Sequence, residues 1–160
     1  MVNGIRGRAI QVALTLLPIA INFKYDRKEW VRKEGKNVNE EKFRNHARKA
    51  VNIFINLGPS FIKLGQWLST RADILPQPYL EEFAKLQDDV TPALFEPVRG
   101  IIEQELGPIE QIFDSFDTTC ISGASMGQVY RARYKGREVI VKVNRPNIHE
   151  IVAKDIAVLK

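Results

Sequence analysis

Residues 116–146 read FDTTCISGASMGQVYRARYKGREVIVKVNRP, and this stretch decides the fold class. It contains short runs rich in β-branched and aromatic residues, and in one of them arginine alternates with tyrosine and alanine, which predicts strands. The pair Lys135-Gly136 predicts a tight turn between two of them. The predicted strands are 117–122, 128–134 and 138–143, with a loop of small residues at Gly123–Gly127. We therefore expect a three-stranded antiparallel sheet.

Helical periodicity dominates the chain ahead of this sheet. A helix is predicted from about Glu41 to Leu57, because its apolar residues recur every three or four positions. Gly58-Pro59 ends that helix, and Pro59 opens the next. Further helices are predicted between Pro59 and about residue 88, and a last helix from Pro146 onward. Another helix is predicted from Thr91-Pro92 to Gly107-Pro108, with these residues facing inward: Val98, Ile101, Ile102 and Leu106. The fold class is therefore α+β.

These elements divide the chain into three predicted segments. Residues 1–40 form a basic N-terminal helix and linker, and residues 41–115 form a helical extension. Residues 116–160 form the sheet and a last helix, which runs into the chain end without a stop signal. We expect this last segment to be an incomplete unit with exposed sheet edges.

The net charge of +5 is unevenly distributed. Residues 1–50 carry twelve Lys/Arg against five Asp/Glu, a net of +7, whereas residues 51–125 carry four against eleven, a net of −7. A basic N-terminal third suits an anionic membrane surface, although solvated helix faces would give the same pattern. No aromatic residues interleave with the basic ones, so we predict no nucleic-acid partner.

Cysteine and histidine offer no metal site in this sequence. Cys120 is the single cysteine, which excludes a disulfide framework and indicates an intracellular chain. His46 and His149 lie far apart and have no second ligand at metal spacing, so both are expected at the surface.

The most apolar stretch, Ile10–Phe23, is predicted to be too short to cross a membrane. No small-residue cleavage pattern follows it, so no signal peptide is predicted. A polar stripe on its helical wheel suits packing against the body or an interfacial position on a membrane. That stripe comprises Arg8, Gln11, Thr15, Pro18 and Asn22, and a linker is expected over residues 24–41. The predicted location is cytoplasmic, with peripheral membrane contact.

The loop and the strand after it carry residues suited to phosphate binding. Protein kinases cover the ATP phosphates with a G-x-G-x-x-G-x-V loop and hold them with a lysine on the third strand. Here Gly127 and Val129 match that loop pattern, and Lys142 lies thirteen residues after Val129 in V-I-V-K. Small residues let backbone N–H groups approach phosphate oxygens, and an ammonium on a rigid strand neutralises their charge. A plain hairpin with a surface lysine is the alternative interpretation.

The helical region resembles the UbiB/ADCK family of atypical kinase-like proteins. Lys63-Leu64-Gly65-Gln66 stands as that family's K-x-G-Q motif, and residues 67–76 resemble its x-L-S-T-R-x-D-L-L-P continuation. Leu86–Val90 resembles its L-Q-D-x-V, and residues 124–129 its alanine-rich loop A-A-A-S-I-G-Q-V. Residues 141–146 are similar to its V-K-V-Q-R-P. The resemblance covers about residues 45–160.

The resemblance implies roles for individual residues. Lys142 would bind the nucleotide, and the loop would lie over the phosphates through Ser122, Gly123, Ala124, Ser125, Met126, Gly127 and Val129. Lys63 and Gln66 would act catalytically, pointing from one helix face into the cleft where an ordinary kinase admits its protein substrate. Ser122 and Gly123 replace two alanines of the family loop, and Ile140 stands where kinases place an alanine against adenine. Both departures bear on nucleotide affinity.

The resemblance further implies ATP and magnesium as cofactors, and an ATPase or unorthodox kinase linked to quinone or isoprenoid lipid biosynthesis. In kinase order, the catalytic loop and metal-binding aspartate lie after residue 160, so no metal ligand is assigned and the fragment is expected to be inactive. The alternative function is a non-catalytic module that docks on a membrane or partner. A nucleotide partner is expected, a lipid or membrane surface suits the basic helix, and a homodimer stays open.

Overall fold

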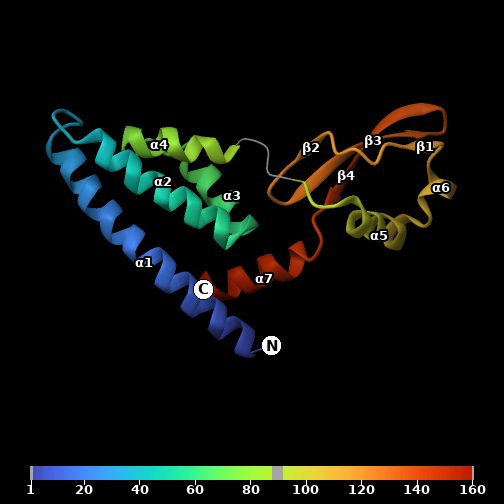
Figure 1. Cartoon of the computed structure of the whole chain (residues 1–160), viewed down its shortest axis with the longest axis horizontal. Coiled ribbons are helices and arrows are strands. Elements are labelled where there is room, and N and C mark those ends of the chain that lie inside the picture. The colour runs from blue at the N-terminus through green and yellow to red at the C-terminus, as the bar shows by residue number, and fades with distance from the viewer. Residues whose placement is uncertain (1, 88–91, 160) are drawn as a thin grey trace. The chain divides into compact units, whose positions relative to one another are not determined.

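The computed structural model describes residues 2–87 and 92–159. The chain divides into two compact units, Met1–Asp88 with Ile151–Lys160, and Asp89–Glu150. The first unit is helical and the second holds the sheet (Figure 1). Within the described residues there are seven α-helices and a four-stranded antiparallel sheet, which confirms the predicted α+β class. The three predicted segments do not coincide with these units, and their functional division stays a prediction.

The helical unit is built around a central helix, α2 (Glu40–Leu57). Its buried side packs on α1 (Val2–Arg32), α3 (Pro59–Leu68) and α4 (Gln77–Ala84), and a short 3-10 turn follows at Lys85–Gln87. The Asn39 side chain caps α2 by accepting a hydrogen bond from the Lys42 N–H at 3.0 Å. Gly58, at φ 101°, ends α2 as predicted. The predicted inward residues of this helix are buried: Phe43, Ala47, Ala50, Val51 and Phe54.

Helix α1 is longer than the sequence predicts. It continues through Pro18 to Arg32, so the expected linker shrinks to residues 33–39. The extra turns form because Phe23 and Trp30 pack against the helical core, with Trp30 at a ring distance of 6.3 Å from Phe43. By length and composition alone, the segment Gly4–Arg32 could cross a membrane, although a core helix or a signal sequence passes the same test. The expectation that the apolar stretch is too short was therefore wrong.

A buried carboxylate that the sequence did not reveal joins three helices of this unit. Asp26 on α1 is fully buried, and its Oδ2 accepts a hydrogen bond from the Tyr79 hydroxyl of α4 at 2.9 Å. His46 Nδ1 of α2 lies 2.7 Å from the same oxygen, so His46 is half-buried and bonded, not a plain surface residue. Burial first, and then Asp26, raises the pKa of the Tyr79 hydroxyl well above its usual value, so it remains a donor.

The sheet unit begins with α5 (Phe95–Leu106) and α6 (Ile109–Ile112). Helix α5 starts at Phe95, later than the predicted start at Thr91-Pro92, and Thr91 itself lies outside the described residues. Gly107, at φ 98°, ends the helix as predicted. Val98 and Ile102 are buried against the sheet, whereas Leu106 is 52% exposed, because α5 ends before its last turn reaches the core. The core of this unit comprises Val98, Ile102, Ile109, Tyr130 and Val143.

The centre of the sheet is β3 (Gly127–Tyr134), which pairs along its length with β4 (Arg137–Asn144). Both confirm predicted strands. On its other edge, β3 pairs with two short strands, β1 (Ser115–Phe116) and β2 (Ser122–Gly123), in place of the single strand predicted at 117–122. The strand is interrupted because Asp117 Oδ1 accepts the Thr119 N–H at 2.9 Å, which turns the chain out of the sheet.

The last helix, α7 (Ile148–Leu159), was predicted to start near Pro146 and to bury apolar residues. Ile148 is buried, but Ile156 is 50% exposed. Asp155 is buried instead and forms an ion pair with Arg8 of α1, with Nε to Oδ1 at 2.8 Å. A hydrophobic pattern could not show this, because the buried group is charged.

Candidate nucleotide site

The register of the sheet places three of the predicted nucleotide residues in one row. Ser122 pairs with Val129, and Val129 pairs with Lys142, so all three lie on the same face of the sheet. Ile140, two residues before Lys142, is on this face and 63% exposed within the chain. The opposite face carries Tyr130 and Val143 into the core with α5. The face that holds Lys142 is therefore available to a ligand.

The loop between β2 and β3 brings Lys142 close to backbone. A Cβ added at Gly127 would lie 3.0 Å from the Val143 carbonyl oxygen and 3.8 Å from Lys142 Cε. Only a residue without a side chain allows β3 and β4 to approach this closely. Lys142 itself is exposed and makes no ion pair with any residue in the ranges 2–87 and 92–159. Its ammonium is thus available to an anion beside Gly127.

The loop itself is a tight turn held by internal hydrogen bonds. The Ala124 N–H donates to the Gly127 carbonyl at 2.8 Å, and the Arg145 N–H donates to the Met126 carbonyl at 3.0 Å. Ser125 is buried at 5% exposure, and Ala124 is exposed. Backbone N–H groups in a turn of this kind form concave sites for anions. The seven predicted loop residues therefore lie together with Lys142 in one unit.

Gln128 is a residue of this site to which the sequence analysis assigned no role. It is fully buried, its Oε1 accepts the Ala93 N–H at 2.6 Å, and its Nε2 donates to the Ala93 carbonyl at 3.2 Å. Nε2 also donates to the Tyr130 hydroxyl, and burial raises the pKa of that hydroxyl. Gln128 therefore fixes the segment before α5 to the sheet. The one sequence signal for a role of Gln128 is its position directly after Gly127 in the loop motif of residues 124–129.

In the helical unit, the predicted residues Lys63 and Gln66 lie on one face of α3. Together with Trp67 and Thr70 they line an open hollow of about 620 Å³. Lys63 is exposed, whereas Gln66 is half-buried and donates from Nε2 to the Leu86 carbonyl at 2.7 Å. Gln66 thus anchors α3 to the 3-10 turn, a structural contact that the sequence did not predict. Of the L-Q-D-x-V stretch that begins at Leu86, residues 88–90 lie outside the described ranges.

Lys63 and Gln66 belong to one compact unit, and Lys142 and its loop belong to the other. The structure places the residues of each group together within its own unit. A joint catalytic role for the two groups stays a prediction.

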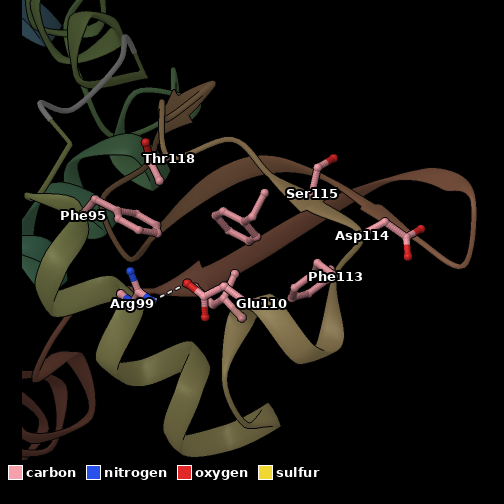
Figure 2. A pocket seen from close by; sticks show the side chains of 9 residues that line it. Phe95, Arg99, Glu110, Phe113, Asp114, Ser115 and Thr118 are labelled. Carbon is pink, nitrogen blue, oxygen red and sulfur yellow. Dashed lines mark hydrogen bonds and ion pairs between the residues drawn. The ribbon is translucent and has the colours of Figure 1, made fainter.

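A second hollow, of about 230 Å³, lies in the sheet unit against α5, α6 and β1 (Figure 2). Its apolar floor includes Phe95, Phe113 and Phe116, and its rim carries Arg99 and Glu110. Arg99 forms ion pairs with both Glu103 and Glu110, and these contacts raise the pKa of its guanidinium. Because the charged groups at its rim pair with each other, this hollow is a poor candidate for an ionic ligand.

No group of three or more His, Cys, Asp or Glu side chains in residues 2–87 and 92–159 is arranged to hold a metal ion. The donor set of the sheet unit consists of an ammonium and backbone N–H groups, which suits phosphate oxygens.

Two antiparallel strands joined by a tight turn, a small-residue loop before the first and a lysine on the second define the start of a protein-kinase-like N-lobe. Comparison with known proteins agrees. Residues 85–160 match the ABC1 atypical kinase-like domain. The chain belongs to the UbiB/ADCK family of atypical kinase-like proteins, as its motifs predicted.

Three relatives illustrate the match. An uncharacterized protein of Synechocystis sp. is 39% identical over 159 residues, 96% of this chain and 27% of that protein. ACTIVITY OF BC1 COMPLEX KINASE 8, chloroplastic, of Arabidopsis thaliana is 49% identical over 66% of this chain and 14% of that protein. A "probable protein kinase UbiB" of Aeromonas salmonicida is 46% identical over 67% of this chain and 20% of its own length. The chain thus spans about a quarter or less of these relatives.

Proposed function

We propose that this chain binds the phosphates of MgATP through Lys142 and the loop Ser122–Gly127. The observation that supports the proposal is the register that sets Ser122, Val129 and Lys142 in one row, with Lys142 Cε beside Gly127. The Lys142 ammonium would neutralise phosphate charge, and the loop backbone would donate hydrogen bonds to phosphate oxygens. Magnesium would enter with the nucleotide.

In the longer proteins of this family, such a site would serve an ATPase or an unorthodox kinase. We propose the same activity for the protein to which this site belongs. The names of the relatives mention protein kinase activity, and a link to quinone or isoprenoid lipid biosynthesis rests on the motif resemblance. Lys63 and Gln66 would contribute to the reaction from the helical unit. The 160 residues on their own would bind nucleotide with little or no turnover.

Thermal unfolding of the chain with and without millimolar MgATP tests nucleotide binding. A ligand at about 100 times its Kd stabilises by about 2.7 kcal/mol, which raises the Tm of a chain of this size by about 8 °C. We expect Lys142→Ala to abolish the rise. Lys135→Ala is the matched control, because Lys135 is exposed at the turn between β3 and β4. No Tm rise in the unsubstituted chain, or an equal rise in Lys142→Ala, would contradict the proposal.

A second candidate function, docking on an anionic membrane, is favoured by the exposed side of α1. Its apolar residues recur at helical spacing and stay solvent-exposed: Ile10 60%, Leu14 69%, Leu17 60% and Ile21 47%. Exposed basic residues lie at both ends of this stripe, among them Arg6, Lys24 and Lys28. An apolar face flanked by cations suits an interface helix on anionic lipid.

Co-sedimentation with vesicles of phosphatidylglycerol and phosphatidylcholine tests this second function. We expect the chain to pellet with anionic vesicles and Leu14→Ser/Leu17→Ser to stay in solution. Ile55→Ser is the control, because Ile55 is an equally apolar residue of α2 that is 50% exposed. A concentration-dependent increase in mass without vesicles, lost in the same double variant, would instead assign this face to a homodimer.

A further inference from the structure

Arg145, the first residue after β4, forms hydrogen bonds to the loop Ser122–Gly127, which the proposed function places over the phosphates. Arg145 Nε donates to the Ala124 carbonyl oxygen at 2.9 Å. The Arg145 backbone N–H donates to the Met126 carbonyl at 3.0 Å. One residue therefore holds two successive corners of the turn, one with its side chain and one with its backbone.

These contacts connect the loop to the end of the strand that carries Lys142. Lys142 and Arg145 lie three residues apart, and Gly127 pairs with Asn144 between them. Arg145 is half-buried, its hydrogen bond to Ala124 lies at the exposed side of the loop, and a hydrogen bond from a charged donor is stronger than a neutral one. The loop end and Lys142 are therefore connected through the pairing of β3 with β4.

The contacts also leave phosphate donors available. The Ala124 carbonyl points to the Arg145 guanidinium and the Met126 carbonyl points to the Arg145 backbone N–H, so both carbonyl oxygens are occupied by Arg145. In the described part of the chain, the N–H groups of Ser125 and Met126 have no hydrogen-bond acceptor. An anion placed beside the turn would supply that acceptor.

We propose that Arg145 is the positioning residue of the phosphate loop and sets its affinity for the phosphate part of a nucleotide. This inference rests on the proposed nucleotide binding. The loop lacks two of the three glycines of an ordinary kinase loop, and a loop fixed in its bound form before the ligand arrives loses less entropy on binding. Arg145 supplies that fixation from outside the loop, and its planar guanidinium holds the Nε donor in a defined direction.

Arg145→Ala and Arg145→Lys in the whole chain test this role by two measurements. The first is backbone hydrogen exchange of a peptide covering residues 122–128 without nucleotide. The second is the Kd for MgATP and for adenosine by titration. We expect Arg145→Ala to speed exchange of the loop and to weaken MgATP about tenfold, the loss given by one charge-assisted hydrogen bond. Adenosine binding should be unchanged because adenosine has no phosphate, and Arg145→Lys should recover part of the MgATP affinity.

Arg137→Ala is the matched control, since Arg137 is exposed at the other end of β4. Equal loss of MgATP and adenosine binding in Arg145→Ala would indicate general damage to the unit and overturn the inference. Unchanged exchange and unchanged MgATP affinity would also overturn it. If the unsubstituted chain binds no MgATP, the proposed function fails, and loop exchange alone still decides whether Arg145 holds the loop.

Discussion

Helix α3 in the helical unit and the start of β3 in the sheet unit each carry a Gly-Gln pair, in which the glycine and the glutamine have corresponding structural roles. Gly65 and Gly127 allow close packing, and Gln66 and Gln128 donate to a backbone carbonyl of another segment. The glycine and glutamine of each pair therefore hold the local structure, whereas the lysine near each pair keeps its side chain exposed.

The two pairs differ in the kind of atom that lies closest to the glycine, side chain at Gly65 and backbone at Gly127. A Cβ at Gly65 would lie 2.4 Å from Leu86 Cδ1 and 3.0 Å from Phe54 Cδ2, the ends of side chains that can move. A Cβ at Gly127 would lie 3.0 Å from the Val143 backbone oxygen of β4, so the paired strand itself would have to shift by a few tenths of an ångström. Helix α3 is thus placed by side-chain packing, whereas the loop is placed by backbone. This difference predicts that substitutions at the loop cost more than the equivalent substitutions in α3.

The largest effect is expected for Gln128→Leu. Leucine has a similar volume but leaves the N–H and carbonyl of the half-buried Ala93 without their side-chain partner and removes the donor to the buried Tyr130 hydroxyl, at about 1–3 kcal/mol for each group left without a partner. We expect the sheet unit to lose about 3 kcal/mol. Trp30 and Trp67 both lie in the helical unit, so hydrogen exchange of β3 amides in urea is the suitable measurement for the sheet unit. A loss below about 1 kcal/mol would contradict the importance of this contact.

An intermediate effect is expected for glycine-to-alanine substitutions, and the two sites should differ. Gly127→Ala should destabilise the sheet unit by about 1–2 kcal/mol because β4 must shift. In Gly65→Ala the strain on Leu86 is offset by the higher helix propensity of alanine, worth about 1 kcal/mol, so the net change should be under about 1 kcal/mol. Urea unfolding followed by tryptophan fluorescence measures the second variant. The opposite order of the two losses would break the comparison.

The smallest effect is expected in α3 from Gln66→Met and Lys63→Met. Gln66→Met removes one half-buried hydrogen bond to Leu86, which should cost about 1 kcal/mol by tryptophan fluorescence in urea. Lys63→Met changes an exposed side chain and should stay within about 0.5 kcal/mol, which makes it the control. Equal losses in the two variants would show that Gln66 contributes no more to stability than its exposed neighbour.

The periodic elements were predictable from the sequence because their signals are local. Gly58-Pro59 and Gly107-Pro108 end helices where they were expected to, and alternation in residues 128–134 gave β3 with Tyr130 and Ala132 inward. The motif spacing was sufficient to predict that Lys142 and the loop lie side by side, as the strand register shows. Leu106 was predicted inward and is exposed, because periodicity alone does not show where a helix leaves the core.

Tertiary structure decided the features that depend on residues far apart in the chain. Asp26 bonded to Tyr79, Asp155 paired with Arg8, and Arg145 bonded to Ala124 are each formed by charged groups, which hydrophobic periodicity assigns to the surface. The same holds for the length of α1, which Trp30 extends by packing on Phe43. Sequence alone determined which short elements form and which lysines are candidates. Only the packed chain decided which polar groups are buried, because their partners meet only on folding.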